Sequence, residues 1–329
     1  MQDKLTPRQA RAWSLCALSV PAAMALPGCG WLWVLGGSIL ACALAVCQQA
    51  MQRHSGLCMR QAFAHAFGAV GGRIMAAAEL LWLLFAASGA AAASQIAFED
   101  DLGPFLPAIP LLLAALAGQK GRLAAGRVCA VLALCLAGLY AVIAAASLRH
   151  VQADWSRPQG VPADAALAFC LCLGPVCMAF VTAEEETPRI SPGTAAASAL
   201  LPAAPAFLTA ACLSPELARQ EPLPFLTLTK SLSVLSVMQR FELLLSVAQL
   251  LGLFALLTML VCAAERMLGA VRRKNGMGST GGVFCLLAFG GSFLAYRLPI
   301  WSWAVGAAIF WGVVPILTQV IVNIKKSEK

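Results

Sequence analysis

Prolines and glycines interrupt the first apolar stretch of the chain, where they could create a binding site. The residues from Trp13 to Gly30 are apolar enough to enter a bilayer, but Pro21 and Pro27 lack the backbone donor that a helix needs. In hydrocarbon, interrupted helices persist only against protein or a watery cavity. The pattern therefore predicts a binding site near the middle of the membrane. A proline-kinked helix that merely packs against its neighbours is the alternative.

A second apolar stretch, 164–183, has the same character. It contains Gly174 and Pro175 and is followed by three acidic residues, Glu184 to Glu186. In a chain of two five-helix halves, the first and sixth helices occupy matching positions, and matched interruptions are typical of a transporter site. The acidic run also fits a helix that simply ends in water, because a charge inside the membrane costs a few kcal/mol.

Three further charged residues lie in or beside apolar stretches. Glu79 lies within 74–97, and an intramembrane acid is a functional candidate by default. Because it lies about two turns from Arg73, a solvated anchor at the membrane interface is the alternative. Arg240 and Glu242 open a later helix, but two residues apart they face different directions, so each needs its own partner.

The sequence shows no recognisable catalytic or metal site. It lacks the nucleophile elbow, the P-loop and the zinc-binding helix motif, and it has no convincing nucleophile–base pair. Its thirteen cysteines include no CxxC pair, and its three histidines are scattered. We therefore expect no enzyme activity, no cofactor, no metal site and no disulfide framework.

Composition indicates an all-α polytopic membrane protein with one integral domain over residues 1–329. The chain is 60% hydrophobic and 12% charged, and its mean hydropathy is +0.80. A soluble domain carries about 25% charged residues. The net charge of +8 lies in short loops between apolar stretches, which indicates a topology signal rather than a nucleic-acid surface.

We expect ten spans of roughly 20 residues each. They lie near 11–28, 31–50, 74–97, 104–118, 125–147, 164–183, 194–213, 238–264, 281–297 and 299–323. Segments expected inside hold 17 Lys and Arg and those expected outside hold 6, which predicts cytoplasmic termini. The stretch 51–72 predicts a short interfacial helix, and 214–237 a segment over the outer mouth. An outer aromatic belt is expected at Trp31, Trp33, Trp301 and Trp303.

Three features carry a resemblance to a known family. The residues Lys4-Leu5-Thr6-Pro7-Arg8-Gln9 precede a first helix that ends Leu26-Pro27. The outer segment Pro224-Phe225-Leu226 … Lys230-Ser231-Leu232 leads into Gln239-Arg240-Phe241-Glu242. The residues Phe180-Val181-Thr182-Ala183-Glu184 resemble the F-x-G-x-E turn of the amino acid–polyamine–organocation superfamily, with Thr182 in place of the glycine. With the ten-span plan, the chain resembles the spore germination permeases, the B subunits of GerA-type nutrient germinant receptors.

The resemblance implies a LeuT-type fold of two inverted five-helix repeats, about 11–147 and 164–323, with the first and sixth helices broken. It implies that unwound backbone lines the ligand site. The implied ligand-binding residues are Ser19, Val20, Pro21 and Ala22 in the first helix and Phe180, Val181, Thr182 and Ala183 in the sixth. We assign structural or coupling roles to Glu79, Glu184, Arg240 and Glu242.

The leading hypothesis is a germinant-sensing subunit in the inner spore membrane. It would bind a small polar nutrient such as an amino acid and pass a conformational signal to an A-type membrane subunit and a C-type lipoprotein. One alternative is a stand-alone secondary transporter for an amino acid or amine in the cell membrane. The other is a membrane scaffold subunit that senses nothing.

Overall fold

The computed structural model describes residues 5–102, 107–155, 157, 159–176, 191–232, 241–272 and 280–327. These residues are helical, with turns and loops between the helices and no strand among them. In chain order the elements are α1 (Pro7–Met24), α2 (Trp31–Ser55), α3 (Met59–Leu102), α4 (Ala108–Gln119), α5 (Arg122–Ser147), η1 (Leu148–His150), α6 (Pro162–Val176), α7 (Pro192–Leu213), α8 (Pro215–Gln220), α9 (Pro224–Ser231), α10 (Phe241–Arg272), α11 (Thr280–Ala295), α12 (Ile300–Ala307), the π-helical η3 (Ala308–Val313) and α13 (Val314–Ser327).

Every predicted span has a helical counterpart in the described residues. Six helices are long and apolar enough to cross a membrane, and they lie in α2, α3, α5, α7, α10 and the continuous α12–α13. Shorter apolar helices, α4, α6 and α11, correspond to the fourth, sixth and ninth spans. The first span corresponds to α1, whose 18 residues are about 27 Å long at 1.5 Å per residue.

Helix α1 begins with a reciprocal cap and ends earlier than predicted. The Thr6 side chain accepts a hydrogen bond from the Gln9 backbone, the Gln9 side chain accepts one from the Thr6 backbone, and Pro7 occupies the first turn. The helix ends at Met24 rather than at residue 28, because Pro27 and its neighbouring glycines lie in a turn over 25–30.

The stretch 51–72 does not form the single short helix that was predicted. Its first residues complete α2, and α3 begins at Met59 and reverses direction at Gly68, whose φ of 76° is left-handed. A Cβ at Gly72 would lie 2.8 Å from the Ala64 Cα, so the two arms of α3 pack closely after the reversal. The short helix therefore exists as the first arm, 59–67, and it continues into the third span.

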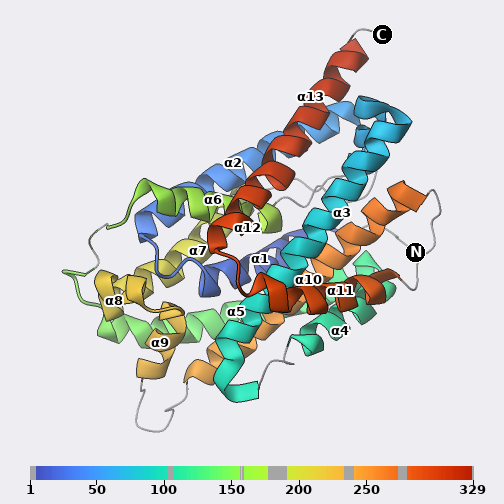
Figure 1. Cartoon of the computed structure of the whole chain (residues 1–329). Coiled ribbons are helices and arrows are strands. Elements are labelled where there is room, and N and C mark those ends of the chain that lie inside the picture. Colours follow the sequence, from blue (N-terminus) through green and yellow to red (C-terminus); the bar gives the residue numbers. More distant parts are fainter. Residues whose placement is uncertain are drawn as a thin grey trace.

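Two short helices, α8 and α9, lie at one end of the bundle, and the α2–α3 connection and the end of α13 lie at the other (Figure 1). Following the predicted orientation, we call the first the outer end and the second the inner end. At the inner end the Lys325 Nζ donates to the Ala66 carbonyl at 2.7 Å, and the Lys326 Nζ donates to the His54 carbonyl at 3.4 Å. These lysines tie α13 to the carbonyl ends of α2 and of the first arm of α3.

Candidate solute-binding cavity

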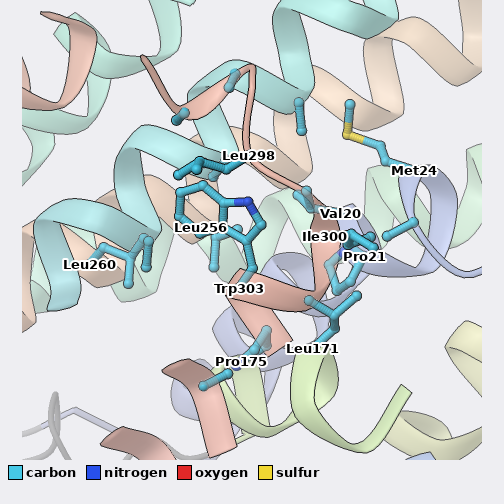
Figure 2. A pocket seen from close by; sticks show the side chains of 18 of the residues that line it. Val20, Pro21, Met24, Leu171, Pro175, Leu256, Leu260, Leu298, Ile300 and Trp303 are labelled. Atoms are coloured by element: carbon cyan, nitrogen blue, oxygen red, sulfur yellow. The ribbon is translucent and has the colours of Figure 1, made fainter. Parts of the chain in front are cut away.

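A cavity of about 370 Å³ lies between α1, α3, α6, α10 and α12. Its volume falls within the range of small-molecule sites. None of the described residues that line it is charged, and most are alanine, leucine, proline or tryptophan. Figure 2 shows side chains of these helices around one space, with the Trp303 ring close to Leu256 and Leu298. The cavity therefore suits a solute with an apolar body.

Three tryptophans from the third and last spans form the aromatic part of the lining. Their rings lie against glycines, where an added Cβ would overlap them, in the pairs Trp82 with Gly306, Trp303 with Gly89 and Trp311 with Gly174. The Trp82 and Trp311 rings meet edge to face, with centroids 5.3 Å apart. The buried Trp82 Nε1 has no hydrogen-bond partner among the described residues.

The first helix contributes to the lining but is not unwound there. Val20 and Pro21 line the cavity, whereas Ser19 and Ala22 do not. All four residues belong to the continuous helix α1, so the expected unwound backbone at 19–22 is wrong. Pro21 removes a single hydrogen bond, that to the Ala17 carbonyl, and the helix continues past it to Met24. Ser19, which does not line the cavity, donates its hydroxyl hydrogen to the Cys16 carbonyl of the same helix, at 2.6 Å.

The sixth helix meets α1 at its proline. Leu171 and Pro175 line the cavity, and the Ser14 Oγ of α1 donates to the Pro175 carbonyl at 2.5 Å. Since proline has no N–H, the Leu171 carbonyl lacks the donor that a regular helix would supply four residues later. The carbonyl that loses its usual donor therefore belongs to a residue of the cavity lining. The predicted ligand residues Phe180, Val181, Thr182 and Ala183, and the predicted coupling residue Glu184, lie outside the described residues.

Glu79 lies on α3, one turn before Trp82. It is 1% exposed, and neither carboxylate oxygen has a hydrogen-bond partner among the described residues. A solvated interfacial anchor, one of the two interpretations of its sequence position, is therefore wrong. Glu242 lies half-buried in the first turn of α10, and Arg240 lies outside the described residues. Coupling roles for these residues stay predictions.

The last span changes helix type beside the cavity. The π-helical turn η3 contains Trp311 and Gly312, whose carbonyls both accept from the Gln48 Nε2, at 2.7 and 3.4 Å. A π-helical turn widens the helix and leaves carbonyls without their usual donors, and such turns are frequent at functional sites. Gln48 thus fixes the turn that carries Trp311 into the lining.

Asp164 joins three elements at the outer end of the molecule. Its Oδ2 accepts from the Gly30 N–H at 2.8 Å and lies 3.6 Å from the Arg219 guanidinium of α8. The first turn of α6 is thereby joined both to the turn after α1 and to α8. In that turn, burial raises the pKa of the Cys29 thiol to about 12, and the nearby Asp164 carboxylate adds to the effect.

The tryptophans were missed as site residues. Trp303 was expected in an interfacial belt, but it lines the cavity. A signal was present, because Trp303 and Trp311 are eight residues apart and so lie near one face of a helix. The small size of Gly89 makes room for the Trp303 ring.

Comparison with known proteins gives structural relatives but no sequence family. No protein-family model and no curated protein matches the sequence. Mhp1, a nucleobase-cation-symport-1 family transporter, closed with bromovinylhydantoin bound, is similar over 95% of this chain and 76% of its own, with a TM-score of 0.62 and 13% identity. An outward-open, substrate-bound Na⁺-coupled sialic acid symporter is similar over 97% of this chain and 76% of its own, with a TM-score of 0.56 and 12% identity.

Inward-facing Mhp1 is also similar, over 97% of this chain and 76% of its own, with a TM-score of 0.54 and 14% identity. These relatives are secondary transporters of the LeuT fold. The chain has that fold and is an integral multi-pass membrane protein, as the sequence predicted.

Proposed function

We propose that the chain is a transporter-like protein that binds a small solute in the cavity between α1, α3, α6, α10 and α12. The observation that carries this proposal is the cavity itself, lined by five helices of a LeuT fold, with Pro21 and Pro175 both in its lining. A pocket of this kind, mostly apolar with a few convergent polar groups, is the usual form of a small-molecule site.

The polar groups beside the cavity define the chemistry of the solute. The carbonyl end of α1 reaches the lining at Met24 and Ala25, and Leu171 of α6, whose carbonyl loses its usual donor at Pro175, also lines the cavity. Both groups carry partial negative charge and favour an ammonium group. The aromatic lining around Trp82 and Trp303 accommodates an apolar or aromatic body. The proposed solute is therefore a small amine or amino acid with an apolar side chain.

A thermal unfolding assay in nanodiscs tests the solute class with four probes: phenethylamine, L-phenylalanine, L-leucine and benzoate. We expect stabilisation by the three ammonium-bearing probes, of about 2.7 kcal/mol at a hundredfold excess over Kd. Benzoate, which has the aromatic ring without an ammonium group, is expected to have no effect. Equal stabilisation by benzoate, or none by any probe, contradicts the proposed chemistry.

We propose further that the chain is the B-type subunit of a nutrient germinant receptor in the inner spore membrane. Support comes from the family resemblance, including the Thr6-Pro7 start and the outer segment around Pro224. The binding signal would pass to an A-type membrane subunit and a C-type lipoprotein. Co-purification of these subunits, and a higher nutrient requirement for germination in Ala90→Phe than in the lipid-facing control Ala137→Phe, would support this role. Normal germination in Ala90→Phe contradicts it.

A second candidate is a stand-alone secondary transporter. The specific observation in its favour is that the structural relatives are symporters and cover nearly all of this chain. Uptake of a bound probe into proteoliposomes that contain only this chain, driven by a sodium or proton gradient, would support the transporter. Binding without uptake in the same preparation would favour the receptor subunit.

A further inference from the structure

Glu79 of α3 is a buried acid that does not line the central cavity. Its side chain is 1% exposed, and it lies in an apolar helix that is long enough to cross a membrane. Neither carboxylate oxygen has a hydrogen-bond partner in the part of the chain that the structure describes. An ionised carboxylate without a partner is costly inside a membrane, so an acid at this depth is a functional candidate.

The neighbours of Glu79 on its own helix are apolar. Ala76 lies one turn before it and Leu83 one turn after it, and both are buried. A hard metal cation requires several oxygen ligands together. The described residues contain no group of acids, histidines and cysteines that could hold a metal ion. The chemistry at this position therefore suits a proton, which needs only the carboxylate itself.

The acid and thiols of the helices on one side of α3 face away from Glu79. The helices packed against α3 are α10, α11, α12 and α13, and the described α11 and α12 contain no charged residue. On α10, the Glu265 carboxylate lies against Gly118 of α4 and Gly281 of α11. The Cys285 thiol of α11 lies near that carboxylate. These groups therefore gather between α4, α10 and α11.

The basic groups of the same helices also lie elsewhere. Arg266 lies near the Cys262 thiol, on the side of α10 toward α5. On α13, the Lys325 Nζ donates to the Ala66 carbonyl at the inner end. Other titratable side chains of α3, α10 and α13 lie toward the helix ends, at Arg60, His65, Arg73, Glu242, Arg272 and Lys326. Among the described residues, no charged group acts on the Glu79 carboxyl.

A buried polar side chain lies between this acid and the inner end of the molecule. The third and last spans meet at the Trp82 and Trp311 rings, 5.3 Å apart, and again where Lys325 reaches the Ala66 carbonyl. Gln319 lies between these two points on α13 and is 2% exposed, and neither amide atom has a partner among the described residues. Buried polar groups of this kind bind internal water. Gln319 therefore offers a polar step between the acid and the inner end.

We propose that Glu79 is a proton-binding site inside the membrane, which exchanges its proton with water at the inner end. Its link to the solute rests on the proposed function. Glu79 precedes Trp82, a lining residue, by one turn, and an ammonium group in the cavity favours the ionised carboxylate. At roughly 10 Å and an effective dielectric constant of about 20, this attraction weakens proton binding about tenfold. Solute binding then releases the proton to water, and the carboxylate keeps the electron pair.

Infrared spectroscopy of the full-length chain in nanodiscs tests the proton site, because a neutral carboxylic acid has a carbonyl stretching band that a carboxylate lacks. At pH 7 an exposed glutamate is neutral in only about one molecule in 500. We expect an acid band at pH 7 that is lost in Glu79→Gln, whose amide copies the shape of the neutral acid. The control Glu216→Gln, which alters an exposed acid of α8, is expected to keep the band.

A second variant covers poor folding of the glutamine variant. Glu79→Asp keeps an acid at this position and is expected to retain the band. An acid band of equal size in the original chain and in Glu79→Gln, or no acid band in the original chain, would overturn the proton site.

Phenethylamine tests the link between the proton and the solute. At saturation it is expected to lower the midpoint of the band's pH titration by about one pH unit, which equals the tenfold change, whereas benzoate should leave the midpoint in place. An unmoved midpoint with a probe that stabilises the protein would overturn the link. Failure of every probe to bind contradicts the proposed function, whereas the acid band decides the proton site independently.

Discussion

Helices α1 and α6 carry the same sequence signal, an internal proline in an apolar helix, but the two prolines act differently. In α1 the Pro21 carbonyl accepts from the Ala25 and Leu26 N–H groups, both at 3.1 Å, so the chain caps itself. In α6 the Pro175 carbonyl accepts from Ser14 of the other helix. The comparison shows that the structural effect of a proline depends on which groups donate to its carbonyl, as well as on the hydrogen bond that the proline removes.

The carbonyls that lose their donors also differ. Pro21 removes the donor of the Ala17 carbonyl, and Ala17 is fully buried away from the cavity. Pro175 removes the donor of the Leu171 carbonyl, and Leu171 lines the cavity. The hydrogen bond missing because of a proline therefore lies at the cavity lining in α6 and away from it in α1.

The largest loss of folding stability in this comparison is expected for Gly174→Ala in α6. The new Cβ would overlap the Trp311 ring, and overpacking of this kind destabilises a fold by about 1–3 kcal/mol. Thermal unfolding in detergent measures the loss. Gly138→Ala on α5 is the matched control, because no atom lies within 4 Å of its Cβ position, and it should stabilise by about 0.5–1 kcal/mol. Equal effects of the two changes would contradict the close contact at Trp311.

The contact between the two helices is tested by Ser14→Ala. Removal of the hydroxyl leaves the buried Pro175 carbonyl without this donor, so we expect a loss of about 1–2 kcal/mol in the free energy of unfolding. Ser302→Ala, which removes an exposed hydroxyl bonded only to Pro299 within its own turn, should change stability by less than about 0.5 kcal/mol. A Ser14→Ala protein as stable as the control would show that the helices are joined by packing alone.

The two prolines can be compared directly through solute affinity. Pro175→Ala supplies an N–H to the Leu171 carbonyl, so we expect about tenfold weaker binding of an ammonium-bearing probe, equivalent to one lost hydrogen bond to a charged group. Pro21→Ala trims the apolar lining but alters no main-chain group at the cavity, because Ala17 does not line it, so we expect a smaller loss of affinity than for Pro175→Ala. Titration of intrinsic tryptophan fluorescence measures both. A larger loss of affinity in Pro21→Ala than in Pro175→Ala would contradict the claim that the missing hydrogen bond in α6 affects the solute more than the one in α1.

The smallest change in free energy is expected at the outer end. Asp164→Ala releases the turn after α1 and a partly exposed ion pair worth about 1 kcal/mol or less. The more sensitive measurement is alkylation of Cys29. Its pKa of about 12 keeps the thiol protonated near pH 8, and exposure would return the pKa toward its usual value, so alkylation should become at least about tenfold faster. Asp154→Ala, in an exposed pair with Arg157, should leave the rate unchanged.

The sequence predicted the spans well because hydrophobic length is a direct requirement of the bilayer. It predicted that the interrupted helices containing Pro21 and Pro175 contribute to one site, and both prolines line the cavity. It did not predict that residues 19–22 stay helical, since this depends on where the helix ends. The pairing of Trp303 with Gly89 and the reversal at Gly68 also escaped prediction, because both depend on contacts or backbone geometry that sequence spacing does not reveal.

The most direct test of the central claim is saturation binding of the best ammonium-bearing probe to two variants in nanodiscs. Ala90→Phe fills the cavity from α3, and Ala137→Phe adds the same group to an exposed position on α5. The account predicts that Ala90→Phe abolishes binding without loss of the folded protein, while Ala137→Phe binds like the original chain. Unchanged affinity in Ala90→Phe would contradict the claim that the solute lies between α1 and α6.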